Sequence, residues 1–174
     1  MFFSTVGNKI APEFDRDRIL NLENRELLEL CKVEAFIGSG PGGQHRNKNY
    51  TAVRLIFKLC DQIYAEDATN RSQKQNIDAA LQKLRLKIAC MWRKKAPELA
   101  GYYHLNSENS LYALEVAKLI DMLADCKLDH KCAALRLNIS ASKLLKEIAR
   151  IPELYLEFQQ ERARLNLNEL KMPR

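Results

Sequence analysis

The chain has 174 residues, of which 47% are hydrophobic and 29% charged, and its formal net charge is +6. This length accommodates one domain or two small ones, and the apolar fraction supports a packed core, which argues against an intrinsically disordered chain. No apolar run approaches the ~18 residues of a membrane span, and residues 1–10 lack the regions of a signal peptide, so we expect a cytoplasmic protein with no membrane partner.

The first elements of the chain give modest signals. Residues 15–22 are compatible with one or two amphipathic turns. The segment from Leu27 to Ile37 reads as a helical start that passes into a strand from about Cys31. Its candidate core positions are Leu28, Leu30, Val33 and Phe36.

Residues 38–48 read Gly-Ser-Gly-Pro-Gly-Gly-Gln-His-Arg-Asn-Lys, and they hold four of the six glycines of the chain. Glycine permits close backbone approach, and Pro41 stiffens the middle of the segment. Such a stretch is often only a turn. A slim loop with a polar tip and a cationic base also suits insertion into a site made of nucleic acid. It is neither a Walker loop nor a dinucleotide fingerprint, because the required spacings are missing.

Two strands and a long helix follow. Residues 51–59 alternate, with Val53, Leu55 and Phe57 on one face, and a third strand begins at Ile63. Apolar residues at helical spacing predict a helix from Ser72 to Met91, with Asn70 or Ser72 as its cap. The apolar face of this helix comprises Ile77, Leu81, Leu84, Ile88 and Met91.

The end of that helix is cationic, with Arg93, Lys94 and Lys95 after Trp92. Cations at a helix C-terminus interact favourably with the helix dipole, and they are also suited to contact with RNA. Trp92 is a candidate for packing or for stacking on a base. Both pairs of alternatives stay open.

The rest of the chain is predicted to be helical. Residues 97–109 read as a linker, and helices are expected over 111–124, 131–137, 141–151 and 153–166. The helices over 131–137 and 141–151, with the residues between them, resemble a helix-turn-helix. Asn138 would take the left-handed turn position and Ser140 would cap the second helix. Residues 96–174 are neutral in sum, so a small helical bundle and a secondary RNA contact or docking role are both open.

Charge is concentrated in the middle of the chain. From residue 46 to residue 95, twelve Lys/Arg stand against four Asp/Glu, a balance of +8, whereas residues 1–45 come to −2. A localised basic patch is the electrostatic footprint expected for a phosphate backbone, although a solvated basic face without a partner has the same pattern.

Conventional catalytic or metal-binding sets are not evident. The five cysteines are odd in number and contain no Cys-x-x-Cys pair, so reduced thiols are expected. Cys126, His130 and Cys132 are close in sequence but lack an evident fourth ligand. His45 has no identifiable catalytic partner, and no paired carboxylates stand near the glycines. We therefore expect no metal and no cofactor.

Four blocks in the same order carry a family resemblance. Gly42-Gly43-Gln44, within residues 39–45 and followed by Asn47-Lys48, resembles the signature of class I peptide chain release factors. Residues 33–36 and 52–55 resemble the strands that enter and leave that loop, and Arg71-Ser72-Gln73 with Asn76 resembles the start of the long helix. The similarity covers roughly residues 26–95.

The resemblance implies ribosome-dependent hydrolysis of the peptidyl-tRNA ester. It gives Gly42, Gly43 and Gln44 the catalytic role, with the Gln44 backbone N–H stabilising the oxyanion, and it implies N5-methylation of Gln44 by a methyltransferase. The expected partners are peptidyl-tRNA and the rRNA of the peptidyl transferase centre of the large ribosomal subunit, with the protein itself a monomer. The residues expected to contact RNA are Ser39, Gly40, Pro41, His45, Arg46, Asn47, Lys48, Arg54, Arg71, Gln73, Arg93, Lys94 and Lys95.

The sequence also departs from full-length release factors. It has no Pro-x-Thr or Ser-Pro-Phe codon-reading tripeptide, and about 25 residues before the catalytic domain are too few for a codon-reading domain. Residues 166–174 hold only Lys171 and Arg174, unlike the basic tail of one rescue type. Arg46, where full release factors usually have valine, resembles the short release factor-like proteins. We expect release from stalled ribosomes without stop-codon reading; the alternative is a non-catalytic ribosome-binding factor.

The expected fold class is α+β: a small mixed sheet with a protruding loop and one long packing helix, followed by an all-α bundle. The predicted divisions are an N-terminal extension (1–25), a catalytic domain (26–96), a linker (97–109) and a helical domain (110–174).

Overall fold

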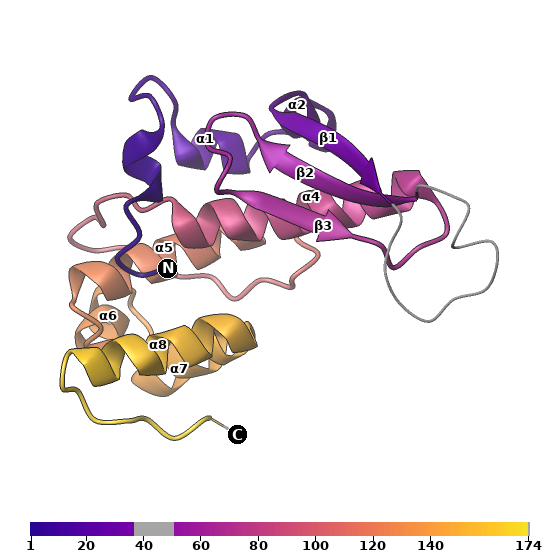
Figure 1. Ribbon diagram of the computed structural model, residues 1–174. Helices are drawn as coiled ribbons and strands as arrows, with labels where there is room; N and C mark the ends of the chain where they lie inside the picture. Colours follow the sequence, from indigo (N-terminus) through magenta and orange to yellow (C-terminus); the bar gives the residue numbers. More distant parts are fainter. Residues whose placement is uncertain (37–50, 174) are drawn as a thin grey trace. The chain divides into compact units, whose positions relative to one another are not determined.

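The computed structural model describes residues 1–36 and 51–173, and it has the expected α+β fold class (Figure 1). The chain divides into two compact units. One comprises Thr5–Trp92, and the other comprises Met1–Ser4 with Arg93–Arg174.

The first unit is built on a three-stranded antiparallel sheet in the order β1-β2-β3. The strands are β1 (Cys31–Phe36), β2 (Ala52–Phe57) and β3 (Tyr64–Asp67). The helix α4 (Gln73–Met91) packs on β2 and β3, along one face of the sheet (Figure 1). The short elements η1 (Val6–Lys9), α1 (Arg16–Leu20) and α2 (Asn24–Glu29) precede the sheet.

The core of this unit lies between the sheet and α4. The predicted inward face of β2 is confirmed, because Val53, Leu55 and Phe57 are fully buried. From α4, Leu81, Leu84 and Ile88 are buried as expected, whereas Ile77 and Met91 are only half-buried. Each such buried side chain contributes roughly 1.5–3 kcal/mol relative to exposure.

The core positions predicted between Leu27 and Ile37 are confirmed only in part, because Leu28, Leu30 and Phe36 are half-buried. Val33 is 43% exposed, because β1 is an edge strand and α4 packs on its neighbours; the buried residues here are Leu27 and Cys31. Ser72 stands at the N-cap of α4, but its side chain makes no capping hydrogen bond.

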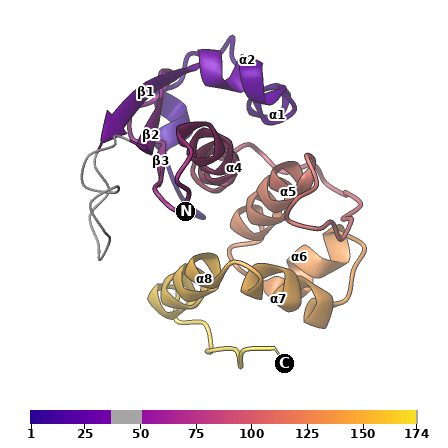
Figure 2. The same ribbon diagram turned by 90° about the vertical axis from the view of Figure 1, so that its right-hand side faces the viewer.

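The second unit contains α5 (Tyr112–Asp125), α6 (His130–Arg136), α7 (Ala141–Ala149) and α8 (Pro152–Arg164). All four lie within two residues of the predicted bounds. Consecutive helices pack on one another (Figure 2), and Phe2 joins them through its ring contact with Phe158, with centroids 5.7 Å apart. Among the described helices of both units, none combines the length and apolarity needed to cross a bilayer.

Candidate functional site

The candidate catalytic residues Gly42, Gly43 and Gln44 lie outside the described residues. The same holds for seven of the expected RNA contacts: Ser39, Gly40, Pro41, His45, Arg46, Asn47 and Lys48. The structure therefore describes the part of the first unit to which residues 37–50 are attached.

The residues that flank residues 37–50 lie on two neighbouring strands. Phe36, the last residue of β1, is the register partner of Ala52, the first residue of β2. Residues 37–50 therefore begin and end at adjacent positions of one antiparallel ladder. The sheet fixes both attachment points, as expected for a segment carried by a rigid scaffold.

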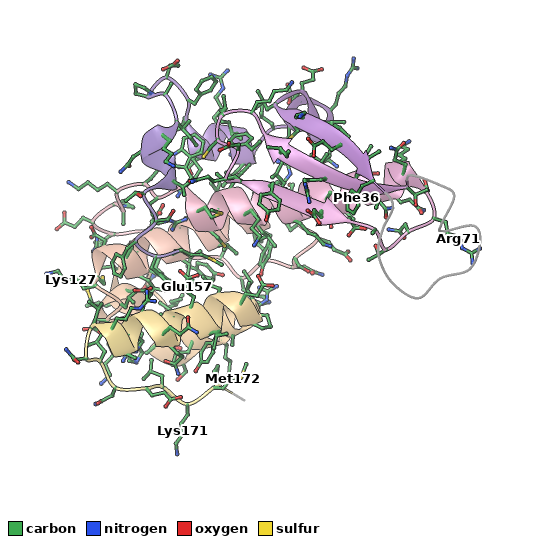
Figure 3. The ribbon with its side chains drawn as sticks, viewed as in Figure 1. Phe36, Arg71, Lys127, Glu157, Lys171 and Met172 are labelled. Atoms are coloured by element: carbon green, nitrogen blue, oxygen red, sulfur yellow. The ribbon has the colours of Figure 1, made fainter. Side chains whose placement is uncertain are left out.

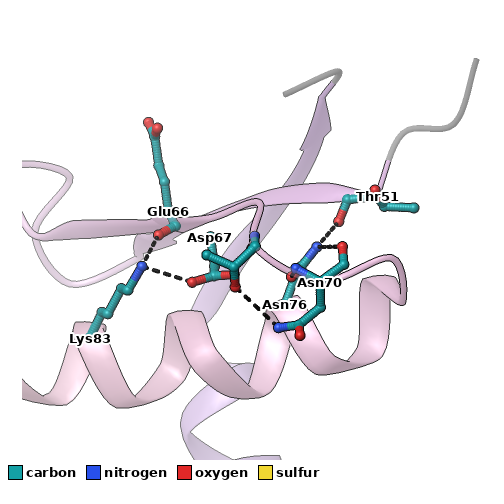
Figure 4. A network of polar contacts seen from close by, with 7 residues as sticks. Thr51, Glu66, Asp67, Asn70, Asn76 and Lys83 are labelled. Carbon is teal, nitrogen blue, oxygen red and sulfur yellow. Dashed lines mark hydrogen bonds and ion pairs between the residues drawn. The ribbon is translucent and has the colours of Figure 1, made fainter. Parts of the chain in front are cut away.

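Asn76 holds the second attachment point in place. Its side chain is fully buried in the first turn of α4, and its Nδ2 donates to the main-chain oxygens of Thr51, at 2.7 Å, and Asn70, at 2.9 Å (Figure 4). Its Oδ1 accepts from the Asn70 N–H at 2.8 Å. One side chain thus joins the residue before β2, the turn after β3 and the long helix.

A second buried polar group completes the connection from β3 to α4. Asp67 accepts a hydrogen bond from the Lys83 Nζ at 2.7 Å (Figure 4). It also accepts one from the hydroxyl of Thr69 at 2.7 Å. Burial alone would raise the pKa of Asp67, but the hydrogen bonds from Lys83 and Thr69 outweigh it and bring that pKa below its ordinary value. We call these residues the anchor network: Thr51, Asp67, Thr69, Asn70, Asn76 and Lys83.

Arg54 lies on the exposed face of β2, between two carboxylates. Its Nε is 2.6 Å from the Glu66 carboxylate, and its Nη1 is 3.8 Å from that of Glu34. Its guanidinium also lies over the rings of Phe36 and Tyr64. The hydrogen bond to Glu66 is the main cause of a raised Arg54 pKa. This cation is therefore compensated locally, which weakens its attraction for a phosphate.

Arg71 and Gln73 are exposed where the turn after β3 enters α4, and Arg71 lies at the same end of the unit as Phe36 (Figure 3). Lys74, also exposed, follows in the first turn of the helix. Cationic side chains beside helical N–H groups favour an anion. Of the expected RNA contacts that the structure describes, Arg71 therefore lies with Arg54 at the end of the unit where Phe36 leads into residues 37–50.

The cations after α4 belong to the helical unit. Arg93 is largely buried and forms an ion pair with Asp121 at 2.9 Å, and the Lys94 backbone N–H donates to the same carboxylate. Lys95 is exposed. Trp92 is 7% exposed and packs against Gly7, and Arg16 donates to its carbonyl oxygen, so the packing alternative for Trp92 is the one observed.

Asp67 and Lys83 had no function predicted from the sequence, and Asn76 was singled out only through the family resemblance. A signal for Asn76 was available: it lies one turn before the buried Ala80 and two turns before the buried Leu84, so it is a polar residue on an otherwise apolar stripe. A buried amide at such a position must find partners.

The described residues contain no group of three or more His, Cys, Asp or Glu side chains arranged to hold a metal ion. Cys126 and Cys132 do come together, with their sulfurs 2.7 Å apart.

Comparison with known proteins gives a family match. The family model of the RF-1 domain matches residues 24–111. Among curated relatives, peptide chain release factor 2 of Nautilia profundicola is 34% identical over 85 residues, which are 49% of this chain and 22% of the relative. Peptide chain release factor 1 of Malacoplasma penetrans is 33% identical over 95 residues, or 55% of this chain and 24% of the relative.

A third relative, peptide chain release factor 1 of Bifidobacterium longum, is 34% identical over 103 residues, covering 58% of this chain and 27% of the relative. The aligned part thus spans about a quarter of the length of these relatives. No solved structure matches this chain.

Proposed function

Since the chain belongs to the RF-1 domain family of class I release factors, we propose that it hydrolyses the ester of peptidyl-tRNA on the ribosome and so releases the nascent peptide. One observation carries the proposal: Gly42-Gly43-Gln44 falls inside the matched residues 24–111. The paired ends of β1 and β2 and the anchor network support it, because they give this segment two fixed attachment points.

Hydrolysis of the ester requires few side chains of the protein, because a backbone N–H can stabilise the oxyanion. A water oxygen attacks the ester carbonyl, the carbon–oxygen bond to the tRNA ribose breaks, and the ribose oxygen takes up a proton. The backbone N–H of Gln44 stabilises the oxyanion that forms on the way; losing one such donor typically costs about 10²–10³ in rate. The Gln44 side chain shapes the water site, and Gly42 and Gly43 allow backbone conformations that a Cβ would block.

The partner that completes this site is rRNA of the large ribosomal subunit. Arg71 and Gln73, exposed at the start of α4, contact its phosphates together with the cationic side chains that follow Gln44. Arg54 contributes less, since Glu66 and Glu34 already neutralise it. The protein acts as a monomer, in the cytoplasm.

Release proceeds without stop-codon reading, on stalled ribosomes. Arg46 supports this, since arginine two residues after Gln44 resembles the form found in short release factor-like proteins.

Gln44 is also the proposed substrate of a glutamine methyltransferase, which adds one methyl group to the side-chain amide nitrogen. A mass increase of one methyl group, located on the peptide that contains Gln44 in protein from its native source, supports this. Unmodified Gln44 in that protein contradicts it.

The decisive experiment measures release of labelled peptide from ribosomes that hold peptidyl-tRNA in the P site and have an empty A site. We expect release by the wild-type protein both on mRNA that ends at the P site and on mRNA that continues with a sense codon. Release only with a stop codon would overturn codon independence.

The variant Gly43→Ala separates catalysis from binding. It should abolish release while ribosome binding in a density gradient is retained. The matched control is Gly101→Ala, because a Cβ at Gly101 meets only ordinary contacts, the nearest at 3.8 Å. If wild type and Gly43→Ala bind ribosomes equally but neither releases peptide, the protein is the non-catalytic ribosome-binding factor instead.

A further inference from the structure

The helical unit contains a helix-turn-helix formed by α6, residues 137–140 and α7. Asn138 adopts a positive φ of 54°, and the Ile139 N–H then donates to the Ala134 carbonyl at 3.0 Å. Ser140 caps α7 by accepting from the Lys143 N–H at 3.2 Å. Because Leu137 and Leu144 are fully buried, the corner has a packed core and a defined outer face.

Charge is distributed unevenly within this neutral part of the chain. From Lys127 to Arg150 there are six Lys/Arg and two Asp/Glu, a balance of +4. Residues 96–174 sum to zero, so the surrounding segments carry the compensating acids. Residues 127–150, which contain the helix-turn-helix, are therefore a basic segment, and the rest of residues 96–174 is acidic in sum.

Both acidic residues of this basic segment already have partners within the helical unit. Asp129 caps α6 and accepts from the backbone N–H groups of Lys131 and Cys132. Glu147 is 7% exposed and pairs with Arg150 at 2.8 Å. Glu147 lies on the same helix as Lys143 and Lys146, but its burial removes its carboxylate from the exposed face of α7.

The outer face of α7 is cationic. Lys143 and Lys146 are exposed and stand three residues apart, which places them on the same side of the helix with exposed Ser142. Neither lysine forms an ion pair with a described residue among the salt bridges of this unit. Exposed Lys127 and Lys131 flank the start of α6, and Lys127 extends away from the fold (Figure 3).

We propose that this helix-turn-helix binds the phosphate backbone of double-helical RNA, with Lys143 and Lys146 as the central contacts. The exposed face of α7 carries two lysines, whose ammonium groups act as point charges suited to phosphates, and it has no asparagine, glutamine or uncommitted arginine for a planar bidentate contact with a base edge. A-form RNA has a major groove too narrow and deep for side-chain reading, so its duplexes are recognised by shape and through phosphates. This binding goes beyond the proposed release activity and does not depend on it.

The test measures affinity of the full chain for a fluorescent 20-base-pair RNA duplex of arbitrary sequence, at several salt concentrations. Lys143→Gln combined with Lys146→Gln should weaken binding at least tenfold at low salt. It should also reduce the slope of log K against log salt by about two, since each phosphate contact contributes about one. The matched control, Arg164→Gln with Lys171→Gln, removes the same charge from the same unit, and we expect less than a twofold effect.

Two results would overturn the inference: equal losses in the two double variants, or wild-type affinity and slope in the Lys143/Lys146 variant. Tighter binding of the wild type to a DNA duplex of the same sequence would overturn the assignment to RNA. Gly43→Ala should bind the RNA duplex as wild type does. Failure of this binding proposal is thereby distinguishable from failure of peptide release, which is measured separately on ribosomes.

Discussion

Asn76 donates a hydrogen bond to the main-chain oxygen of Thr51 at 2.7 Å, across 25 residues of sequence. Thr51 is the first described residue after the segment that carries Gly42-Gly43-Gln44. The same amide group also satisfies both main-chain groups of Asn70. A single buried side chain thus fixes where the candidate catalytic segment rejoins the sheet.

Asn76→Asp should therefore destabilise the protein and reduce peptide release. The substitution keeps the shape but removes two donors and places a carboxylate against the carbonyl oxygens of Thr51 and Asn70, at a cost of about 3 kcal/mol. Urea denaturation measures the loss. Gln75→Glu, which makes the same charge change at the exposed neighbouring position, should shift the unfolding free energy by less than about 0.5 kcal/mol. Equal stability of the two variants would contradict this account of Asn76.

Asp67 should make stability depend on acid pH. Its pKa is lower in the folded state than in the unfolded chain, so its contribution is complete above the unfolded pKa of about 3.9 and is lost as pH falls through the lower folded pKa. Asp67→Asn should lower the unfolding free energy at pH 7 and flatten its decrease below about pH 4. Asp61→Asn, at an exposed position, serves as the control. A wild-type acid slope in Asp67→Asn would show that Asp67 is not the group responsible.

Gly7→Ala should destabilise the first unit. A Cβ at Gly7 would lie 2.3 Å from Cδ1 of Trp92, whose buried ring has little room to move. Overpacking of this kind costs about 1–3 kcal/mol. Because Trp92 is the only tryptophan, its fluorescence in urea reports both the change in packing and the unfolding midpoint. Gly101→Ala, with no contact under 3.8 Å, should leave both unchanged; an equal shift there would remove the steric explanation.

Periodicity predicted the regular elements well, because it records which side of an element faces the core. The strand β2 and the helices α4 to α8 could be located in this way. It could not reveal that Val33 belongs to an edge strand that α4 leaves uncovered, because strand order and helix placement are set by contacts distant in sequence. The tripeptide of the candidate site was readable from the sequence, whereas its support by Asn76 depends on a partner 25 residues away.

The tertiary contacts of residues 97–109 could not be predicted from the sequence either. Their glycine and polar residues favour a linker, yet Tyr102 is buried and donates to Glu147 of α7 at 3.0 Å. His104 approaches the same carboxylate at 2.5 Å, and the Tyr103 N–H donates to Glu115 at 3.0 Å. The buried carboxylates of Glu115 on α5 and Glu147 on α7 hold this segment on the helical unit through these contacts.

Glu147→Gln should therefore release residues 97–109 from the helical unit. Burial alone would raise the pKa of Glu147, but its bonds to Arg150, His104 and Tyr102 lower that pKa overall, so the ionised form is the one that these partners stabilise. The neutral amide has one acceptor oxygen in place of two, and its N–H₂ group would face Arg150 or His104. We expect a loss of about 1–3 kcal/mol and faster cleavage by chymotrypsin next to Tyr102 and Tyr103. Mass spectrometry of the fragments locates the cut. Glu153→Gln, an exposed change in α8, is the control, and an unchanged cleavage rate at these tyrosines in Glu147→Gln would show that Glu147 does not anchor the segment.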